Sequence, residues 1–362
     1  MSDLTIRKGT CHALFAYDVA YAIDLDLAQQ RIASTAERVK VHQRRRAPDS
    51  FEYRPAPLLV TVQVDPIQLG EYTTSPSVEL VLYDFGAISV SFVFPLAGPF
   101  DGLPALAVAL RGRTPLLPES FLQIQQLMKQ LGPAAARPRM SEVQEGYNLF
   151  VVESFTQPVE PEELWTRQAG TVARVLRGEE RPLAEQEISD ATAYRLSFAA
   201  DDVVFIDTDA ALLYDKEGED ACAVIELANT QLMEMRHLDQ QLDTALDRAY
   251  EMLARQRTGG PFKRRRPDLH RLTELQLDGA VLLEQVSNAV KLIGDHYLSR
   301  VYARVSQRFR LEQWDASISR KLQTVESIYT KMVDRSNARR MEVLEWIIVI
   351  LIAFEIVLGL VH

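Results

Sequence analysis

The sequence has few cysteines and none of the short motifs that mark common enzyme classes. Cys11 and Cys222 are the only cysteines and lie far apart, so we expect no disulfide framework and a reducing compartment. No Walker loop, dinucleotide-binding glycine loop, nucleophile elbow or His-Glu-x-x-His helix occurs. The histidines have no metal-ligand spacing. The sequence therefore predicts no enzyme activity, no catalytic residue, no cofactor and no metal site.

Positive charge is also scarce. Lys and Arg number 40 against 50 Asp and Glu, which gives a net charge of −10. Broad nucleic-acid binding usually needs a basic surface. We therefore expect nucleic-acid contact only indirectly or through the short basic run Lys263–Arg266, with Arg44–Arg46 as a second run that could touch phosphates. Either run could equally be a solvated loop, and the acidic stretch Asp207–Asp220 is either a solvated turn or a cation site.

The first 219 residues predict a head that mixes strands and helices. The stretches 58–64 and 77–96 are rich in β-branched residues, and Gly86 in the second predicts a hairpin turn. Strands and helices follow one another without a steady strand–helix–strand order, so the predicted fold class is an α+β head. Further strands are predicted at 9–17, 148–155 and 193–214, and helices at 117–131 and 161–176.

Residues 220–340 predict a stalk of long helices. The range 221–257 has no Gly or Pro, and its apolar residues recur at spacings of three and four. A basic linker with helix breakers covers 258–267, and a second helix is predicted over 268–340. We expect these helices to pack as an antiparallel pair or a coiled coil.

The second helix continues its apolar stripe in steps close to a heptad repeat. Contacts with other subunits would bury this stripe and make a homo-oligomer, whereas folding within one chain would make a bundle. The apolar positions alone do not separate these alternatives. The predicted oligomer seam consists of Leu311, Trp314, Ile318, Leu322, Val325, Tyr329 and Met332.

The C-terminal residues 343–361 predict a single transmembrane helix. At 1.5 Å per residue the segment spans roughly 28 Å, close to the hydrocarbon thickness of a bilayer. The predicted membrane anchor consists of Trp346, Ile347, Ile348, Val349, Ile350, Leu351, Ile352, Phe354, Glu355, Ile356 and Leu358.

The charges around this segment predict its topology. Arg335, Arg339 and Arg340 precede it and only His362 follows. Positive charge on the near side predicts a single-pass protein of the inner (cytoplasmic) membrane, with the bulk of the chain in the cytoplasm. Glu355 within the segment either faces other helices as a functional or packing site, or is protonated or reaches toward the interface.

Three segments carry a family resemblance. LEWIIVILIAFEI at 344–356, YDFGAISVSF at 83–92 and IELANTQLMEMRHLD at 225–239 resemble motifs of the family named for "required for meiotic nuclear division", a domain of unknown function, in its bacterial form. The resemblance implies a membrane-associated homo-oligomer and, through a mitochondrial member, a link to translation at the membrane. It implies no catalytic residues.

These features together predict a membrane-anchored, non-enzymatic oligomeric scaffold. Its cytoplasmic head would meet protein partners, and its other partners would be membrane lipid and further copies of the chain. The alternative function is an ion channel or transporter of CorA-like layout, in which oligomerised C-terminal helices place Glu355 in a pore. An enzyme that uses the head is a third hypothesis, without a residue constellation to support it.

Overall fold

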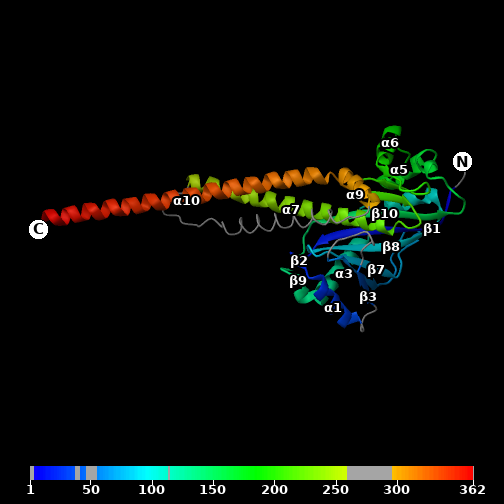
Figure 1. The fold of residues 1–362 in the computed structure, drawn as a ribbon, viewed down its shortest axis with the longest axis horizontal. Coiled ribbons are helices and arrows are strands. Elements are labelled where there is room, and N and C mark those ends of the chain that lie inside the picture. The colour runs from blue at the N-terminus through cyan, green and yellow to red at the C-terminus, as the bar shows by residue number, and fades with distance from the viewer. Residues whose placement is uncertain (1–3, 37–40, 46–54, 113–114, 259–295, 362) are drawn as a thin grey trace. The chain divides into compact units, whose positions relative to one another are not determined.

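The computed structural model describes residues 4–36, 41–45, 55–112, 115–258 and 296–361 (Figure 1). Its internal contacts divide the chain into two units. The sheet unit comprises Met1–His237 and Glu284–Trp314, and the helical unit comprises Leu238–Leu283 and Asp315–His362.

Nine of the described strands form one mixed sheet in the order β11-β12-β13-β10-β1-β8-β7-β4-β3. Neighbouring strands are antiparallel except β10 and β13, which are parallel. The strands are β1 Thr5–Asp18, β3 Val41–Arg45, β4 Leu58–Gln63, β7 Ser77–Leu82, β8 Ala87–Pro99, β10 Gln144–Phe155, β11 Arg195–Leu196, β12 Val203–Ile206 and β13 Ala210–Tyr214. Two short ladders lie beside it, β2 Ala22–Ile23 with β9 Ala135–Ala136 and β5 Gln68–Leu69 with β6 Tyr72–Thr73.

The central strand β1 is buried on both faces. Alternate side chains of a strand point to opposite faces, so Cys11 and Ala13 belong to one core and Leu14 and Ala16 to the other. Cys11 lies opposite a phenylalanine on each neighbouring strand. Burial raises the pKa of the Cys11 thiol, so this cysteine behaves as a small apolar core residue.

The hairpin predicted over 77–96 is confirmed as β7 and β8. Its turn contains Gly86 with a φ of +96°, and a Cβ at this position would lie 2.0 Å from the carbonyl oxygen of Ala20. Only glycine fits such a backbone approach. The carbonyl oxygen of Gly86 accepts hydrogen bonds from the backbone of Val19 and Ala20 at 3.0 and 3.2 Å. The turn therefore fixes the chain that leaves β1.

One sheet face is covered by six helices, which supply residues such as Ile32, Leu106, Ile124 and Val172 to a common core. The range 161–176, predicted as one helix, forms two. The helices are α1 Leu25–Ala36, α2 Leu103–Leu110, α3 Leu116–Leu131, α4 Pro161–Trp165, α5 Ala169–Arg177 and α6 Glu185–Ala193, with the 3-10 turns η1 Phe100–Gly102 and η2 Gly132–Ala134.

The opposite sheet face is covered by α9 His296–Phe309 and by the first part of α7 Glu219–Thr258. Phe309 packs edge-to-face on Tyr147 of β10, with ring centroids 5.3 Å apart. Val305 of α9 and Ala228 of α7 are fully buried. Because helices lie on each face, strands such as β12 and β13 are largely apolar rather than alternating.

In the helical unit, α7 packs against α10 Leu311–Val361. Lys321 contacts Asp243 at 2.6 Å, and Arg236, seven residues earlier on α7, lies over the ring of Trp314, seven residues earlier on α10. The two helices therefore run parallel, as Figure 1 shows, and the antiparallel pairing predicted for the long helices is wrong for this pair.

The predicted second helix over 268–340 is not continuous in its described part. Arg310 adopts a left-handed φ of +58°, which ends α9 and starts α10. The basic linker 258–267 and the start of the predicted helix fall almost wholly within 259–295, outside the described residues.

The predicted transmembrane helix is contradicted. Among the described residues, no helix combines the length and the apolarity that crossing a bilayer requires. The predicted inner-membrane localisation and single-pass topology depended on this helix and are corrected with it.

Candidate functional site

A polar cluster forms where β1 ends. Asp18 is the last residue of β1 and points to the face that α7 covers. The chain after β9 runs beside it, because the amide of Arg139 donates to the carbonyl oxygen of Val19 at 2.9 Å and the amide of Ser141 donates to that of Asp18 at 3.0 Å. Arg139 and Ser141 are thereby held next to the carboxylate of Asp18.

Helix α7 supplies the other side of the cluster. Glu234 and His237 are three residues apart and so lie on one helix face. Ser141 Oγ is 2.7 Å from His237 Nδ1, and His237 Nε2 is 2.8 Å from Asp18 Oδ2. Arg139 donates from Nη2 to the same Asp18 oxygen at 2.9 Å. We call these five residues, Asp18, Arg139, Ser141, Glu234 and His237, the Asp18 cluster.

The acidic side of the Asp18 cluster is deeply buried. Asp18 and Glu234 are each 1% exposed, whereas the side chain of Arg139 is 41% exposed. Burial raises the pKa of Glu234 well above its usual range, the negative charge of Asp18 acts in the same direction, and Arg139 opposes both. Glu234 Oε1 has no hydrogen-bond partner in the described part of the chain. Glu234 is therefore held toward its neutral form beside an arginine-paired Asp18.

The connectivity of the Asp18 cluster is that of a carboxylate, an imidazole and a hydroxyl in series. In this arrangement the carboxylate orients the ring and the ring accepts the hydroxyl proton. The ring of His237 is turned so that Nδ1 faces Ser141, the reverse of the serine proteases. No group of three His, Cys, Asp or Glu within the described residues has metal-binding geometry. The hydroxyl, the ring and the carboxylate of the cluster offer hydroxyl and proton chemistry.

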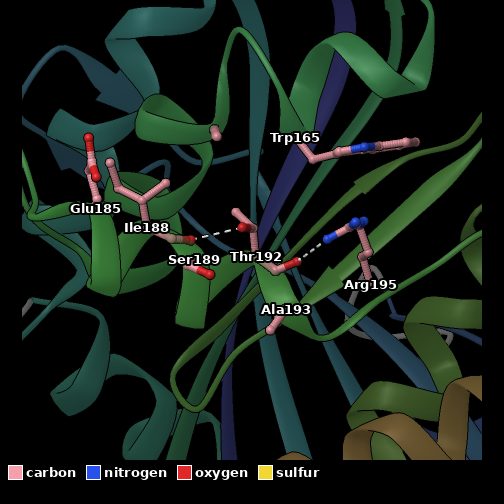
Figure 2. Close-up of a pocket in the computed structure, with 8 residues that line it drawn as sticks. Trp165, Glu185, Ile188, Ser189, Thr192, Ala193 and Arg195 are labelled. Carbon is pink, nitrogen blue, oxygen red and sulfur yellow. Dashed lines mark hydrogen bonds between the residues drawn. The ribbon is translucent and has the colours of Figure 1, made fainter.

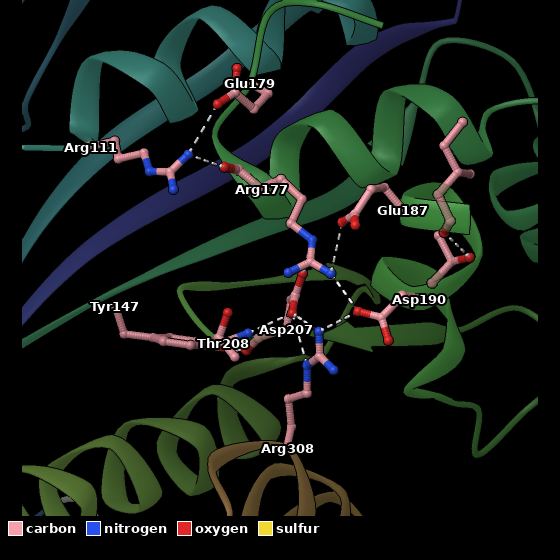
Figure 3. A network of polar contacts seen from close by, with 11 residues as sticks. Arg111, Tyr147, Arg177, Glu179, Glu187, Asp190, Asp207, Thr208 and Arg308 are labelled. Carbon is pink, nitrogen blue, oxygen red and sulfur yellow. Dashed lines mark hydrogen bonds and ion pairs between the residues drawn. The ribbon is translucent and has the colours of Figure 1, made fainter. Parts of the chain in front are cut away.

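A second polar cluster surrounds Asp207, which is fully buried after β12 (Figure 3). Arg308 of α9 donates from Nε to its carboxylate at 2.8 Å, and Arg177 of α5 approaches at 3.2 Å. Both arginines also contact Asp190 of α6, and the hydroxyl of Tyr147 donates to the Asp207 carbonyl oxygen at 2.9 Å. We call these residues the Asp207 network. Hydrogen bonding from Arg308 is the largest cause of a lowered pKa at Asp190.

The acidic stretch Asp207–Asp220 does not form one site. The carboxylate of Asp207 is occupied by two guanidinium groups, whereas Asp209 and Asp220 are exposed. A buried carboxylate already paired with two arginines has no charge left to attract a cation. The Asp207 network joins α5, α6, α9 and the sheet, and its chemistry is structural.

A cavity of about 490 Å³ lies between α4, α5, α6 and β11 (Figure 2). Its cationic side chain, Arg195, lies over the ring of Trp165 at 5.2 Å and donates to the carbonyl oxygen of Thr192 at 3.0 Å. Most of the other lining side chains, such as Glu185 and Ser189, come from one face of α6, and Ala169 of α5 completes the lining. The cavity brings together no set of groups that points to a reaction.

The predicted oligomer seam is partly buried inside one chain. Leu311, Ile318 and Val325 are at most 3% exposed, whereas Trp314, Leu322 and Tyr329 are half-buried. Ile328, which the prediction left out, is also buried. The side chain of Met332 lies outside the described residues. Subunit contact through this seam stays a prediction.

The predicted anchor residues divide into two groups. The side chains of 346–352 are exposed, from 48% at Ile347 to 67% at Trp346. The side chains of Phe354, Glu355, Ile356 and Leu358, of the topology residues Arg335, Arg339 and Arg340, and of the basic runs Arg44–Arg46 and Lys263–Arg266 lie outside the described residues.

Sequence reasoning missed the whole Asp18 cluster. Its members lie on three segments that no short motif links, and His237 stands among histidines without a shared spacing. One signal was present on α7: Glu226, Asn229 and Glu234 lie within its buried stretch 224–235, and each is at most 2% exposed. Acids are almost never fully buried unless they are paired, so a buried acid indicates polar partners on a neighbouring segment.

Comparison with known proteins places the first part of the chain. A family model described as "Uncharacterized protein MJ0711, N-terminal domain" matches residues 8–221. A curated relative, uncharacterized protein MJ0711 of Methanocaldococcus jannaschii, is 23% identical over 222 residues, which are 60% of this chain and 66% of the relative. No solved structure matches the chain.

This match contradicts the predicted resemblance to the required-for-meiotic-nuclear-division family. Two of the three segments behind that resemblance, 225–239 and 344–356, lie beyond the matched residues, and apolar helices of unrelated proteins share such patterns. The third, 83–92, is a hairpin whose glycine turn many folds require. The implied link to translation at a membrane is withdrawn with the family.

Proposed function

We propose that the chain, which belongs to the family of the MJ0711 N-terminal domain, is an assembly protein. In this proposal α10 joins several copies of the chain, and the sheet unit that each copy carries binds a protein partner. This role needs no catalytic residue. The ion-channel alternative required a membrane-spanning helix and has lost that basis.

One observation carries the proposal, the apolar surface of α10 at 346–352. All seven side chains are apolar and 48–67% exposed. Successive helix residues are about 100° apart, so seven in a row point to every side. A helix that is apolar on every side is stable in water only when other groups surround it. We call residues 346–352 the apolar segment.

The neighbouring part of α10 shows how such a stripe is covered. Ile318, Val325 and Ile328 are buried within the helical unit, where Leu242 and Ala249 of α7 are buried as well. In the described part of the chain the apolar segment has no such cover. A second copy of the chain is the occupant we propose, because the apolar segment continues a heptad-like stripe and is complementary to itself. In a dimer each helix would cover only one side of its partner, and the rest of the apolar segment would stay exposed. We therefore expect a bundle that contains α10 from more than two copies of the chain.

Light scattering of the full chain after size exclusion tests the proposal. The wild type should have a mass several times that of the 40.9 kDa chain. Ile348→Asp combined with Leu351→Asp places two charges on one side of α10 and should reduce the mass to that of a single chain. Phe121→Asp with Leu122→Asp on α3 is the matched control, since these side chains are 42% and 44% exposed and should leave the mass unchanged.

Three results would overturn the proposal. The wild type could have the mass of one chain, the α10 variant could keep the mass of the assembly, or the α3 variant could lose it. A wild type that is a single chain but binds lipid vesicles would assign the apolar segment to a lipid surface instead.

A further inference from the structure

The Asp18 cluster combines a hydroxyl, an imidazole and a carboxylate at hydrogen-bond distance, and assembly makes no use of them. We propose that Ser141 is a nucleophile that accepts the acyl group of a small activated ester, with His237 as general base and Asp18 as the residue that positions the ring. This inference goes beyond the assembly role and departs from the expectation of a chain without enzyme activity.

The hydrogen bonds assign the direction of proton transfer. Arg139 donates to Asp18 at 2.9 Å, which favours the ionised carboxylate. An ionised carboxylate needs a donor, so His237 presents Nε2–H to Asp18 at 2.8 Å and leaves the lone pair of Nδ1 facing Ser141. The hydroxyl of Ser141 then donates to Nδ1 at 2.7 Å. The neutral ring is in the tautomer that a general base requires.

Ser141 Oγ keeps electron density available for attack. The amide of Val143 donates to it at 2.9 Å, which occupies one of its two lone pairs. When the hydroxyl proton passes to His237, Ser141 Oγ has electron density that is not engaged by Val143 and can form a bond to the substrate. This short turn also holds the hydroxyl in place against the ring, so little reorientation precedes the reaction.

Glu234 limits the negative charge near the ring. Burial raises the pKa of Glu234 well above its usual range and Asp18 adds to this effect, so the neutral acid is favoured beside the Asp18–His237 pair. The imidazolium that forms during proton transfer is then balanced mainly by Asp18, as in other hydroxyl–imidazole–carboxylate sites.

The reactive side of the cluster borders solvent. Ser141 is half-buried on the connection between β9 and β10, and the side chain of Arg139 is 41% exposed, whereas Asp18 is 1% exposed. The positioning carboxylate is therefore shielded, while the hydroxyl is reachable and the ring of His237, whose side chain is 12% exposed, lies between them. A short acyl group that approaches from solvent fits this arrangement.

The proposed reaction is balanced within the cluster and water. Ser141 Oγ forms a bond to the carbonyl carbon of the ester while its proton passes to His237 Nδ1. The bond between the carbonyl carbon and the alcohol oxygen breaks, and the alcohol leaves with that proton. Water then attacks the acyl-serine, His237 takes and returns one proton, and the carboxylic acid departs. No oxidant, reductant or metal is needed.

The test is acylation of the full chain by p-nitrophenyl acetate and phosphonylation by a fluorophosphonate probe. We expect one acetyl or phosphonyl group per chain by intact mass, located on Ser141 by peptide mapping. Because the mapping uses the wild type, a folding defect in a variant cannot hide the answer. An unmodified chain, or an adduct located on another residue, overturns the proposal.

Variants then test each role. Ser141→Ala should remove the adduct, and His237→Gln should slow labelling by about 100-fold or more. Asp18→Asn should slow labelling and move the rise of the rate with pH to lower pH, because the imidazolium loses its carboxylate partner. Ser189→Ala, a serine of α6 outside the cluster, is the matched control and should label at the wild-type rate. Equal labelling of the wild type and His237→Gln would overturn the role of the histidine.

Discussion

The Asp207 network and the Asp18 cluster are two polar regions of the sheet unit that share a common architecture. Each is centred on an aspartate that is at most 1% exposed, and each joins a helix distant in sequence to the sheet. They differ in what surrounds the carboxylate. Asp207 meets two arginines, which remain charged at any physiological pH. Asp18 meets one arginine and a histidine, whose proton can move.

This difference gives the Asp207 network a structural role and gives the Asp18 cluster groups that can take part in a reaction. A carboxylate paired with two guanidinium groups has a fixed charge state, and its removal leaves buried charges without a partner. The Asp18 cluster has a hydroxyl and an imidazole in series, and its second acid, Glu234, is held toward the neutral form. We therefore expect changes in the Asp207 network to affect stability most, and changes in the Asp18 cluster to affect protonation and reactivity most.

The largest effect on stability is expected for Asp207→Asn. The amide keeps the shape of the side chain but leaves Arg308 and Arg177 without their buried counter-charge. Breaking a buried ion pair from one side costs about 3–5 kcal/mol, and the remaining contacts of both arginines with Asp190 favour the lower end of that range. Urea denaturation followed by circular dichroism measures this loss in the free energy of unfolding.

Asp201→Asn is the matched control for that measurement. Asp201 also pairs with a cation, Lys216, but both side chains are more than 70% exposed. An exposed pair contributes about 0–1 kcal/mol, so we expect a loss of about 0.5 kcal/mol or less. Equal losses for Asp201→Asn and Asp207→Asn would show that burial does not distinguish the Asp207 network from a surface pair.

A smaller, pH-dependent effect is expected for Glu234→Gln. Burial and the nearby Asp18 raise the pKa of Glu234 in the folded chain above its ordinary value of 4.5, with Arg139 opposing. The folded chain thus holds a proton that the unfolded chain releases. The stabilisation is fully present below pH 4.5 and is lost as the pH rises toward the folded-state pKa, by up to about 1.4 kcal/mol per pH unit.

Glutamine cannot ionise, so the stability of Glu234→Gln should not fall with rising pH in the way that the wild type's does. The free energy of unfolding of the variant, relative to the wild type, should increase between about pH 5 and about pH 7. Glu326→Gln, at an exposed position of α10, should follow the wild type at each pH. Parallel curves for the wild type and Glu234→Gln would mean that Glu234 is not held in its neutral form.

Local patterns in the sequence predicted many elements but not their surroundings. The hairpin of β7 and β8 follows from its β-branched runs and Gly86, and most of α7 follows from a stripe without Gly or Pro. The parallel direction of α7 and α10 could not follow, because an apolar stripe has the same spacing whichever way its partner runs. The transmembrane prediction treated apolarity as evidence for lipid, although the same run suits a protein interface.

The Asp18 cluster was beyond sequence reasoning for a different reason. Asp18, Ser141 and His237 come from a strand end, a loop and a helix, and only the sheet order and the turn at Gly86 bring them together. The family match extends over 8–221 and so includes the first two but not His237. Chemistry that depends on three separate segments leaves no spacing for a motif to record.

Among changes within the Asp207 network and the Asp18 cluster, the smallest effect on stability is expected for Ser141→Ala, and it gives the sharpest test of the comparison. The variant loses hydrogen bonds to His237 and Val143, but Ser141 is half-buried, so water can replace part of them. We expect a loss of about 1 kcal/mol in the free energy of unfolding, measured in the same urea denaturation as Asp207→Asn. A loss as large as that of Asp207→Asn would make Ser141 a structural contact like the arginines of the Asp207 network. A small loss together with complete loss of acylation would instead place the function of Ser141 in its reactivity, because the fold would have little need of the hydroxyl.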